Sequence, residues 1–465
     1  MTFNAWSVFY DFAVISVLLV FSQLLRAKIG VIQKLMIPAS LIAGALGLLL
    51  GPNGLGYIQF SKQLETYSSI LIVLVFAALP LGTKLAGVKK MGRDVGEMWN
   101  VVSFAALSQY GWGMLLCLFV LGAFWELHQG FGYILATGFF GGHGTAAAVG
   151  ASFKAYQWGD EAFTLGMTCA TIGIICAIIP GVFLNNFAAR KGWTREVSSP
   201  DEVNGVKGGD TELLTGLVPE SKRQPIGMET ISGVSLESLS FHFAVIMTAA
   251  VAGWYANKYL KGLWPTVDVP TFCLALFAGY ILQGIMEATK SDTYVDRRTV
   301  NSVSGLAADY LIVAGMSAIK IALVVKYAIP FALLMLFGFG LCIFNVLVIG
   351  PKAFKEYWFE RSMFIYGFST GALVTSIILL RMIDPKMKSK SMETYAIVGL
   401  LDRPMFIALI ALGPVLIGTG YAIHFAVVCS ILAFVPLVLA RMVGWWYPKK
   451  GLESIVRKEV VAETS

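Results

Sequence analysis

The sequence Gly-Gly-His-Gly-Thr at residues 141–145 interrupts the apolar stretch 130–153, and Gly-Phe-Ser-Thr-Gly at residues 367–371 interrupts the apolar stretch 362–380. A bilayer offers no water to unpaired backbone groups, so such a break is costly unless it lines an enclosed, wet cavity. At about 1.5 Å per residue, each stretch is roughly long enough to cross a membrane as one helix, so length alone does not decide its path. The path of these two stretches decides the fold.

The composition of the whole chain indicates a membrane protein. Of its 465 residues, 57% are hydrophobic and 14% are charged, and the mean hydropathy is +0.73. Soluble domains are about 45–50% apolar and about 25% charged, so a water-soluble enzyme is excluded. The apolar runs are continuous, which excludes a membrane β-barrel. The net charge of +7 comes mostly from short loops, so no nucleic-acid partner is expected and an all-α integral membrane protein is predicted.

Eleven long apolar runs are predicted to be membrane-spanning helices. The polar segment 191–240, rich in Gly, Ser, Pro, Glu and Lys, separates the first five from the other six. The predicted spans are residues 8–25, 36–50, 68–81, 99–122, 163–187, 241–257, 271–285, 305–325, 329–349, 394–418 and 421–443.

The distribution of Lys and Arg residues predicts how the two interrupted stretches are placed. Cytoplasmic loops are enriched in Lys and Arg. If both stretches are re-entrant and the N-terminus is outside, 28 of the 35 Lys and Arg residues fall in inside loops and five in outside loops. An arrangement in which either stretch crosses weakens this bias. The charges therefore favour two re-entrant hairpins, an outside N-terminus and a cytoplasmic C-terminus.

This topology predicts an internal symmetry. Each half has five spans, with one hairpin between its fourth and fifth spans, and an odd number of spans inverts the second half. The predicted fold is two inverted repeats of five transmembrane helices, each with a re-entrant hairpin, plus an extra C-terminal transmembrane helix. The predicted divisions are residues 1–190 (first repeat), 191–240 (polar cytoplasmic linker), 241–420 (second repeat) and 421–465 (extra helix and cytoplasmic tail).

The first break is the strongest candidate for a binding site. Carbonyls freed by a helix break can coordinate a cation, and N–H groups freed at the start of the second half-helix can hold a carboxylate. A packing motif of small residues is the alternative. Five consecutive small or polar residues exceed what packing requires, so we favour a binding role for Gly141, Gly142, His143, Gly144 and Thr145.

Other polar residues near the breaks have two interpretations that the sequence leaves open. His143 is either a proton carrier or a hydrogen-bonded structural residue. Thr168 and Thr171 either face the same cavity or bond to the backbone of their own helix. Thr145 and Thr171 are the candidate sodium ligands. The second break presents the same choice, between ligand binding and packing, for Ser369, Thr370, Gly371 and Thr375.

Charged residues at membrane depth are costly and commonly functional. Asp402 and Arg403 lie inside the predicted span 394–418. The guanidinium of Arg403 can hold a carboxylate with two hydrogen bonds, whereas an ion pair with Asp402 or Asp309 would make it structural. No H-E-x-x-H or phosphate-binding loop motif is present. The G-x-S-x-G spacing occurs at residues 367–371, inside an apolar stretch and not at the strand-to-helix turn that a serine nucleophile requires. Neither an enzyme nor a cofactor is therefore expected, and transport would run on an ion gradient.

The first break, followed by Met-Thr-Cys-Ala-Thr-Ile-Gly at residues 167–173, resembles the bacterial sodium:glutamate symporter family. The resemblance covers most of both membrane halves, including Ile37-Pro38 and residues 269–272 and 367–375. It implies inverted repeats with two re-entrant loops, a homodimer in the bacterial inner membrane, and an elevator-like movement of the part that carries the hairpins. It also implies sodium-coupled uptake of L-glutamate, with sodium as the coupling ion.

Two departures from that family keep alternatives open. The second break is shorter than the usual Gly-rich loop, and Asp402, Arg403 and the eleventh span have no recognised counterpart. Sodium-coupled transport of another small carboxylate or a dicarboxylate is therefore an alternative. A channel or a receptor on the same scaffold is another.

Overall fold

A computed structural model describes residues 4–34, 37–83, 92–197, 199, 215–263, 269–371 and 373–447 of the chain. Within these ranges the regular structure is helical, without β-strands. Eight helical units there are long and apolar enough to cross a membrane, which agrees with the predicted all-α membrane protein. They are α1 (Ala5–Lys28), Arg93–Ala123, α8 (Gly159–Lys191), α11 (Ser238–Leu263), α12 (Thr271–Thr289), Ala328–Ala353, α19 (Ser391–Gly418) and α20 (Ala422–Met442).

Two of these units contain a π-helix. The unit Arg93–Ala123 consists of α5 (Arg93–Leu115), the π-helix η1 (Leu116–Val120) and the short η2 (Leu121–Ala123). The unit Ala328–Ala353 consists of α15 (Ala328–Phe344), the π-helix η6 (Asn345–Ile349) and α16 (Gly350–Ala353). Each unit directly precedes one of the interrupted stretches in the sequence.

Shorter helices occupy the remaining predicted spans. α3 (Ala39–Leu50) and α4 (Leu64–Ala78) lie in the second and third predicted spans and have 12 and 15 residues. The other short elements in the described ranges are α2 (Gly30–Lys34), η3 (Lys154–Tyr156), η4 (Glu220–Lys222) and η5 (Ser291–Tyr294).

The predicted span 305–325 is not one continuous helix. It is divided into α13 (Arg297–Ser317) and α14 (Ile321–Lys326). Lys320 is extended between them, and its amino group pairs with the partly exposed Asp160. The helix therefore ends where this charge finds a partner at the surface, as long cationic side chains commonly do.

Each interrupted stretch forms two short helices. The first consists of α6 (Tyr133–Phe139) and α7 (Gly142–Phe153), and the second of α17 (Trp358–Thr370) and α18 (Leu373–Ile383). With 7 to 13 residues each, none of the four reaches across about 30 Å of hydrocarbon. We call the two pairs hairpin one and hairpin two.

The two ends of each hairpin lie close together. In hairpin one, the ring of Tyr133 at the start of α6 lies 6.1 Å from the ring of Phe153 at the end of α7. In hairpin two, Nη2 of Arg361 near the start of α17 donates to the carbonyl of Ser389, which follows α18, at 3.4 Å. The chain thus leaves each hairpin near the point where it entered.

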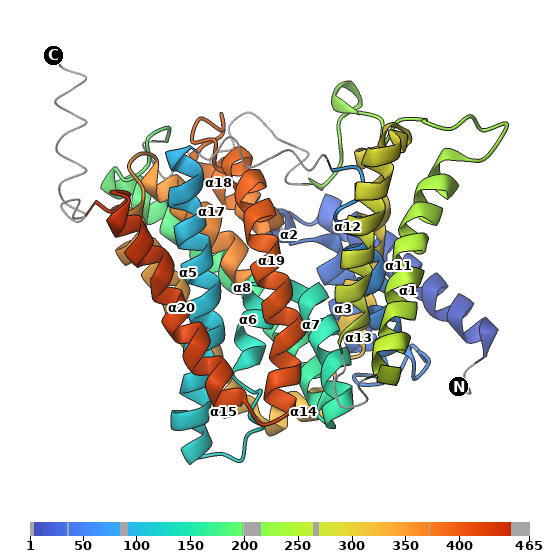
Figure 1. Ribbon diagram of the computed structural model, residues 1–465, viewed down its shortest axis with the longest axis horizontal. Coiled ribbons are helices and arrows are strands. Elements are labelled where there is room, and N and C mark those ends of the chain that lie inside the picture. The colour runs from blue at the N-terminus through green and yellow to red at the C-terminus, as the bar shows by residue number, and fades with distance from the viewer. Residues whose placement is uncertain are drawn as a thin grey trace.

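The helices form two bundles (Figure 1). Bundle A contains α1, α3, α4, α11, α12 and α13, and bundle B contains α5, α8, α15, α19, α20 and both hairpins. Each bundle combines helices from both halves of the sequence: α4 packs on α12 and α13, and α8 packs on both hairpins. The bundles meet where α4 and α13 contact α7.

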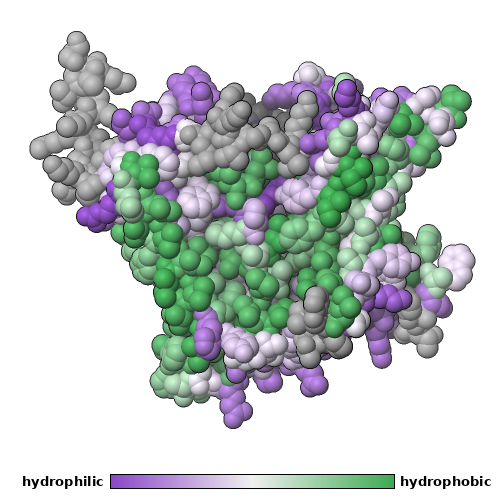
Figure 2. Space-filling model, in the orientation of Figure 1, coloured by the Kyte–Doolittle hydropathy of each residue, from purple (hydrophilic) through white to green (hydrophobic). Residues whose placement is uncertain are grey.

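An apolar belt separates two polar ends of the molecule (Figure 2). Ion pairs join loops that the charge distribution places on the same side of the membrane. These pairs are Lys154–Glu65 and Lys320–Asp160 for predicted outside loops, and Arg361–Asp94 and Lys388–Glu196 for predicted inside loops.

Candidate functional site

A cavity of about 950 Å³ lies between the two bundles. α4, α12 and the start of α13 line it from bundle A, and both hairpins, α5 and α19 line it from bundle B. Most lining side chains are apolar or aromatic, as in small-molecule sites where a few polar groups orient the ligand. The polar side chains that line it are those of Thr83, Tyr110, Thr145, Arg297, Tyr395 and Arg403.

The tip of hairpin one faces this cavity. Gly141, Gly144 and Thr145 line it. Gly142 has a φ of +67°, a conformation that side chains disfavour, so this glycine permits the turn into α7. A Cβ at Gly144 would lie 2.9 Å from Cδ1 of Ile72 on α4. Bundle A therefore approaches the backbone of the tip closely, and a side chain at this position would require the end of the Ile72 side chain to shift.

His143 and the two threonines of α8 lie behind the tip. Nε2 of the buried His143 is 3.1 Å from Oγ1 of Thr171. Thr171 donates to the carbonyl of Met167 at 2.9 Å, and Thr168 donates to the carbonyl of Thr164 at 2.7 Å. Since the Thr171 proton is used on Met167, Nε2 of His143 donates to Thr171. None of these side chains lines the cavity, so the geometry favours hydrogen-bonded structural roles.

The hydroxyl groups of hairpin two bond to the backbone of the hairpin itself. Ser369 and Thr370 both donate to the carbonyl of Tyr366, at 3.3 and 2.6 Å. Thr375 donates to the carbonyl of Gly367 at 2.8 Å. None of these hydroxyl groups lines the cavity, so these bonds stabilise hairpin two rather than face a ligand there.

The two breaks meet inside bundle B. A Cβ at Gly142 would lie 3.3 Å from the carbonyl oxygen of Gly371. Phe140, directly before the first break, and Phe368, within the second, form an edge-to-face pair with ring centroids 4.8 Å apart. The tertiary structure thus brings together two stretches that are far apart in the sequence, and hairpin two supports the tip that faces the cavity.

Asp402 and Arg403 are neighbours in α19 with different surroundings. Asp402 is buried, and its Oδ1 accepts a hydrogen bond from Oγ of Ser103 on α5 at 3.0 Å. Arg403 lines the cavity, and its buried Nη1 has no hydrogen-bond partner. Arg403 forms no ion pair with Asp402, Asp309 or any other residue in the described ranges. Its guanidinium is therefore open to an anion in the cavity.

Arg297 is a site residue that the sequence did not single out. Its Nη1 donates to the carbonyls of Ala78 and Leu81 beyond the end of α4, at 3.1 and 2.6 Å. It also lines the cavity, where its charge and that of Arg403 repel each other. No sequence signal separates Arg297 from the adjacent Arg298, which is exposed, because both lie in a predicted basic loop.

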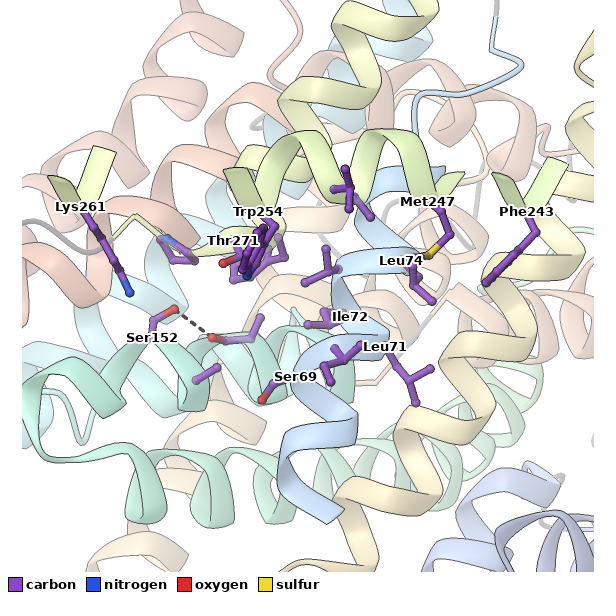
Figure 3. Close-up of a pocket in the computed structure, with 18 of the residues that line it drawn as sticks. Ser69, Leu71, Ile72, Leu74, Ser152, Phe243, Met247, Trp254, Lys261 and Thr271 are labelled. Carbon is purple, nitrogen blue, oxygen red and sulfur yellow. Dashed lines mark hydrogen bonds between the residues drawn. The ribbon is translucent and has the colours of Figure 1, made fainter. Parts of the chain in front are cut away.

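A second hollow is an apolar groove of about 650 Å³ between α4, α7, α11 and α12 (Figure 3). Leu71, Ile72 and Met247 lie along it, and Lys261 is its one charged lining residue. Ser69 and Ser152 also line the groove, but they donate to carbonyls of their own helices, whereas two guanidinium groups and the hydroxyl of Thr145 line the cavity between the bundles. That cavity is therefore the candidate substrate site.

The tip of hairpin one offers oxygen atoms of the kind that hard cations prefer. The hydroxyl of Thr145 forms no hydrogen bond with a described residue. A Cβ at Gly141 would lie 2.5 Å from Cβ of Thr145 and 2.6 Å from the carbonyl oxygen of Thr137, so a backbone oxygen lies near this threonine. Over the described ranges, no cluster of three or more His, Cys, Asp and Glu side chains is placed to hold a metal ion. The available chemistry at the tip is that of hydroxyl and carbonyl oxygens.

Broken helices that meet beside a cavity between two bundles are typical of secondary transporters. Comparison with known proteins agrees with this class. Residues 4–388 match the family described as Sodium/glutamate symporter. The chain belongs to the sodium/glutamate symporter family. α19 and α20, and with them Arg403, follow the matched residues.

Two relatives are named sodium/glutamate symporters. The chain is 25% identical over 288 residues to the one from Haemophilus influenzae, which covers 60% of this chain and 65% of that protein. It is 23% identical over 368 residues to the one from Escherichia coli K12, which covers 77% of this chain and 84% of that protein. The chain thus spans slightly less than two thirds of the first relative.

Proposed function

We propose that this protein is a secondary active transporter that couples sodium to the movement of L-glutamate across the bacterial inner membrane. The observation that carries the proposal is Arg403, a guanidinium without an ion-pair partner among the described residues, in a cavity lined by the tip of hairpin one. A carboxylate would supply the missing partner through two parallel hydrogen bonds. The names of the two relatives support sodium and glutamate as the cargo.

In this proposal the substrate and the ion are held by different elements. Arg403 binds a substrate carboxylate. The hydroxyl of Thr145 and the backbone oxygens at Gly141 and Gly142 bind sodium. Thr171, the second predicted sodium ligand, contacts the tip through His143. The remaining predicted site residues do not contact the ligand and instead stabilise the hairpins, α8 and α19. They are Ser369, Thr370, Gly371, Thr375, Thr168 and Asp402.

We also propose that the hairpins are re-entrant and that residues 1–190 and 241–420 are inverted repeats. The ends of each hairpin lie close together, which a re-entrant path requires. A π-helix, η1 or η6, lies at the corresponding position before each hairpin. The first three membrane helices of each half form bundle A, and the later elements form bundle B. This order supports an internal repeat, with the linker 191–240 between the halves and residues 421–465 as an addition.

The movement that we propose is an elevator-like displacement of bundle B against bundle A. Bundle B carries both hairpins and Arg403, so substrate and ion would travel with it. The contact of Gly144 with Ile72 lies between the moving and the fixed bundle, where a bare backbone allows sliding. A homodimer, an outside N-terminus and a cytoplasmic C-terminus complete the proposal. The ion pairs support the grouping of the loops into two sides, and the Lys and Arg distribution supports which side is cytoplasmic.

Uptake into liposomes tests the function. The full chain is reconstituted, and labelled L-glutamate uptake is measured with and without an inward sodium gradient. We expect uptake that requires the gradient and stops when a sodium ionophore collapses it. No gradient-dependent uptake of glutamate, aspartate, citrate or malate would overturn the proposal. Uptake of malate or citrate without glutamate would favour the dicarboxylate alternative, and a steady ion current without substrate would favour a channel.

A further inference from the structure

The cavity between the bundles has a guanidinium on each wall. Arg403 comes from α19 in bundle B, and Arg297 comes from α13 in bundle A. Among the described residues that line the cavity, none is Asp or Glu. The two positive charges repel each other, and apolar walls strengthen this repulsion because the effective dielectric constant is lower than in water.

Neither guanidinium has its charge compensated by an acidic residue in the described part of the chain. Arg403 has no ion-pair partner among the described residues, and both recorded hydrogen bonds of Arg297 are made by Nη1 to neutral carbonyls. Burying a charge without an opposite charge is unfavourable. An anion in the cavity would therefore stabilise both walls.

Two separate anionic groups suit this arrangement better than one. The arginines belong to different bundles and line the same cavity of about 950 Å³. A single carboxylate paired with one of them leaves the other unpaired. A short chain with a carboxylate at each end can pair with both at once.

We infer that Arg297 is a second specificity-determining residue of this cavity: it holds one carboxylate of a substrate whose other carboxylate pairs with Arg403. The inference rests on the proposed transport function and assigns one arginine to each carboxylate of its substrate. Analogues that lack one carboxylate are rejected because they leave a guanidinium unpaired, which is how polar sites achieve strong discrimination. In this arrangement of the bundles the ligand contacts Arg403, which belongs to bundle B, and Arg297, which belongs to bundle A.

A purely structural role for Arg297 makes a different prediction. Its bonds to the carbonyls of Ala78 and Leu81 tie the end of α4 to the start of α13. If this were its whole role, replacing it would lower stability and weaken all ligands alike. A change in the preference between ligands therefore separates the two roles.

The test compares three ligands on the purified full chain in sodium-containing buffer. L-Glutamine replaces the side-chain carboxylate of L-glutamate with an amide, and γ-aminobutyrate lacks the α-carboxylate. Thermal-shift titration gives an affinity for each. For the wild type we expect glutamate to bind at least 100-fold more tightly than either analogue. The test uses two affinity ratios, glutamate to glutamine and glutamate to γ-aminobutyrate. We expect Arg297→Gln to lower one of these ratios at least tenfold and Arg403→Gln to lower the other at least tenfold.

The matched control is Arg298→Gln, which removes the same charge from the adjacent, exposed residue and should leave both ratios unchanged. Arg297→Lys serves if Arg297→Gln does not fold, and should lower the same ratio by a smaller factor. Unchanged ratios in both Arg297 variants would overturn the inference. A wild type that binds glutamine and γ-aminobutyrate as tightly as glutamate would overturn it while leaving transport intact, whereas binding of none of the three would also remove the proposed function.

Discussion

The two helix breaks have similar sequences and different surroundings. At the break of hairpin one, Gly144 and Thr145 face the cavity between the bundles. At the break of hairpin two, Thr370 and Thr375 donate to carbonyls of their own hairpin. A run of small and polar residues therefore specifies where a helix turns back. Whether that turn becomes a binding surface depends on what packs in front of it.

The two hairpins also differ at their bases. Near the base of hairpin one, His128 stacks on Trp158 with ring centroids 4.1 Å apart. At the base of hairpin two, the buried carboxylate of Glu360 accepts a hydrogen bond from the backbone N–H of Arg195 at 2.8 Å. Stacked aromatic rings thus stabilise the base of hairpin one, and a buried carboxylate stabilises the base of hairpin two. We therefore expect the stability of the two bases to depend differently on pH.

The largest effect is expected where bundle A contacts the tip of hairpin one. In Gly144→Leu the new Cβ would lie 2.9 Å from Ile72 before the rest of the side chain is added. Overpacking at a contact between moving parts should reduce sodium-driven uptake at least 100-fold. Gly284→Leu is the control, because a Cβ there meets nothing within 4 Å. Near-normal uptake by Gly144→Leu would show that the tip does not move against Ile72.

The hydroxyl groups of the two hairpins give the second test. Thr145→Val should lower sodium-dependent uptake at least tenfold without lowering the melting temperature, because it removes a proposed ion ligand. Thr375→Val removes a bond to the carbonyl of Gly367 and should cost about 1 kcal/mol of stability while the sodium dependence stays unchanged. If both variants change sodium-dependent uptake and melting temperature to the same extent, the two breaks do not differ in function.

Arg403 tests whether α19 shares the binding surface of hairpin one. Arg403→Lys keeps the positive charge but replaces a planar fork with a point charge. We expect the apparent KM for glutamate to rise about tenfold, which corresponds to about 1.4 kcal/mol, with a smaller change in maximal uptake. Kinetics equal to the wild type would assign Arg403 a structural role.

The smallest effect is expected at the base of hairpin two. Burial raises the pKa of Glu360 to about 7, although the hydrogen bond from Arg195 opposes this shift. The folded protein then holds this proton more tightly than the unfolded chain, where the Glu pKa is about 4.5. Stability therefore falls as the pH rises from about 4.5 to about 7, by about 1–3 kcal/mol in total.

Glu360→Gln should remove this fall, because the amide does not titrate. The measurement is the melting temperature of the purified protein between pH 5 and 8. Glu356→Gln changes a nearby exposed carboxylate and is the matched control. An unchanged pH dependence in Glu360→Gln would show that other groups cause it.

Much of the fold was predictable because its causes are local. Apolar runs form helices in a bilayer since each backbone group must be paired within its own segment. The breaks at residues 141–145 and 367–371 were visible for the same reason. The division of the predicted span 305–325 was not predicted, because it depends on the pairing of Lys320 with Asp160, a residue from a distant loop.

The candidate site was predictable only in part. Gly141, Gly144, Thr145 and Arg403 were singled out in the sequence and line the cavity. Arg297 was missed, because a basic residue in a predicted loop looks the same whether it faces solvent or a cavity. The choice between ligand and structural roles for His143 was open as well, since its contact with Thr171 spans 28 residues.

The amino-acid sequence alone was enough to establish that this chain is helical, where its two hairpins break and which family it resembles. These follow from hydrophobicity, charge and motifs within single segments. Only the tertiary structure decided that Arg403 turns to the cavity while Asp402 turns to Ser103, and that Arg297 lines the same cavity as Arg403. The physical reason is that a site formed between two bundles depends on contacts among distant segments, and no single segment carries that information.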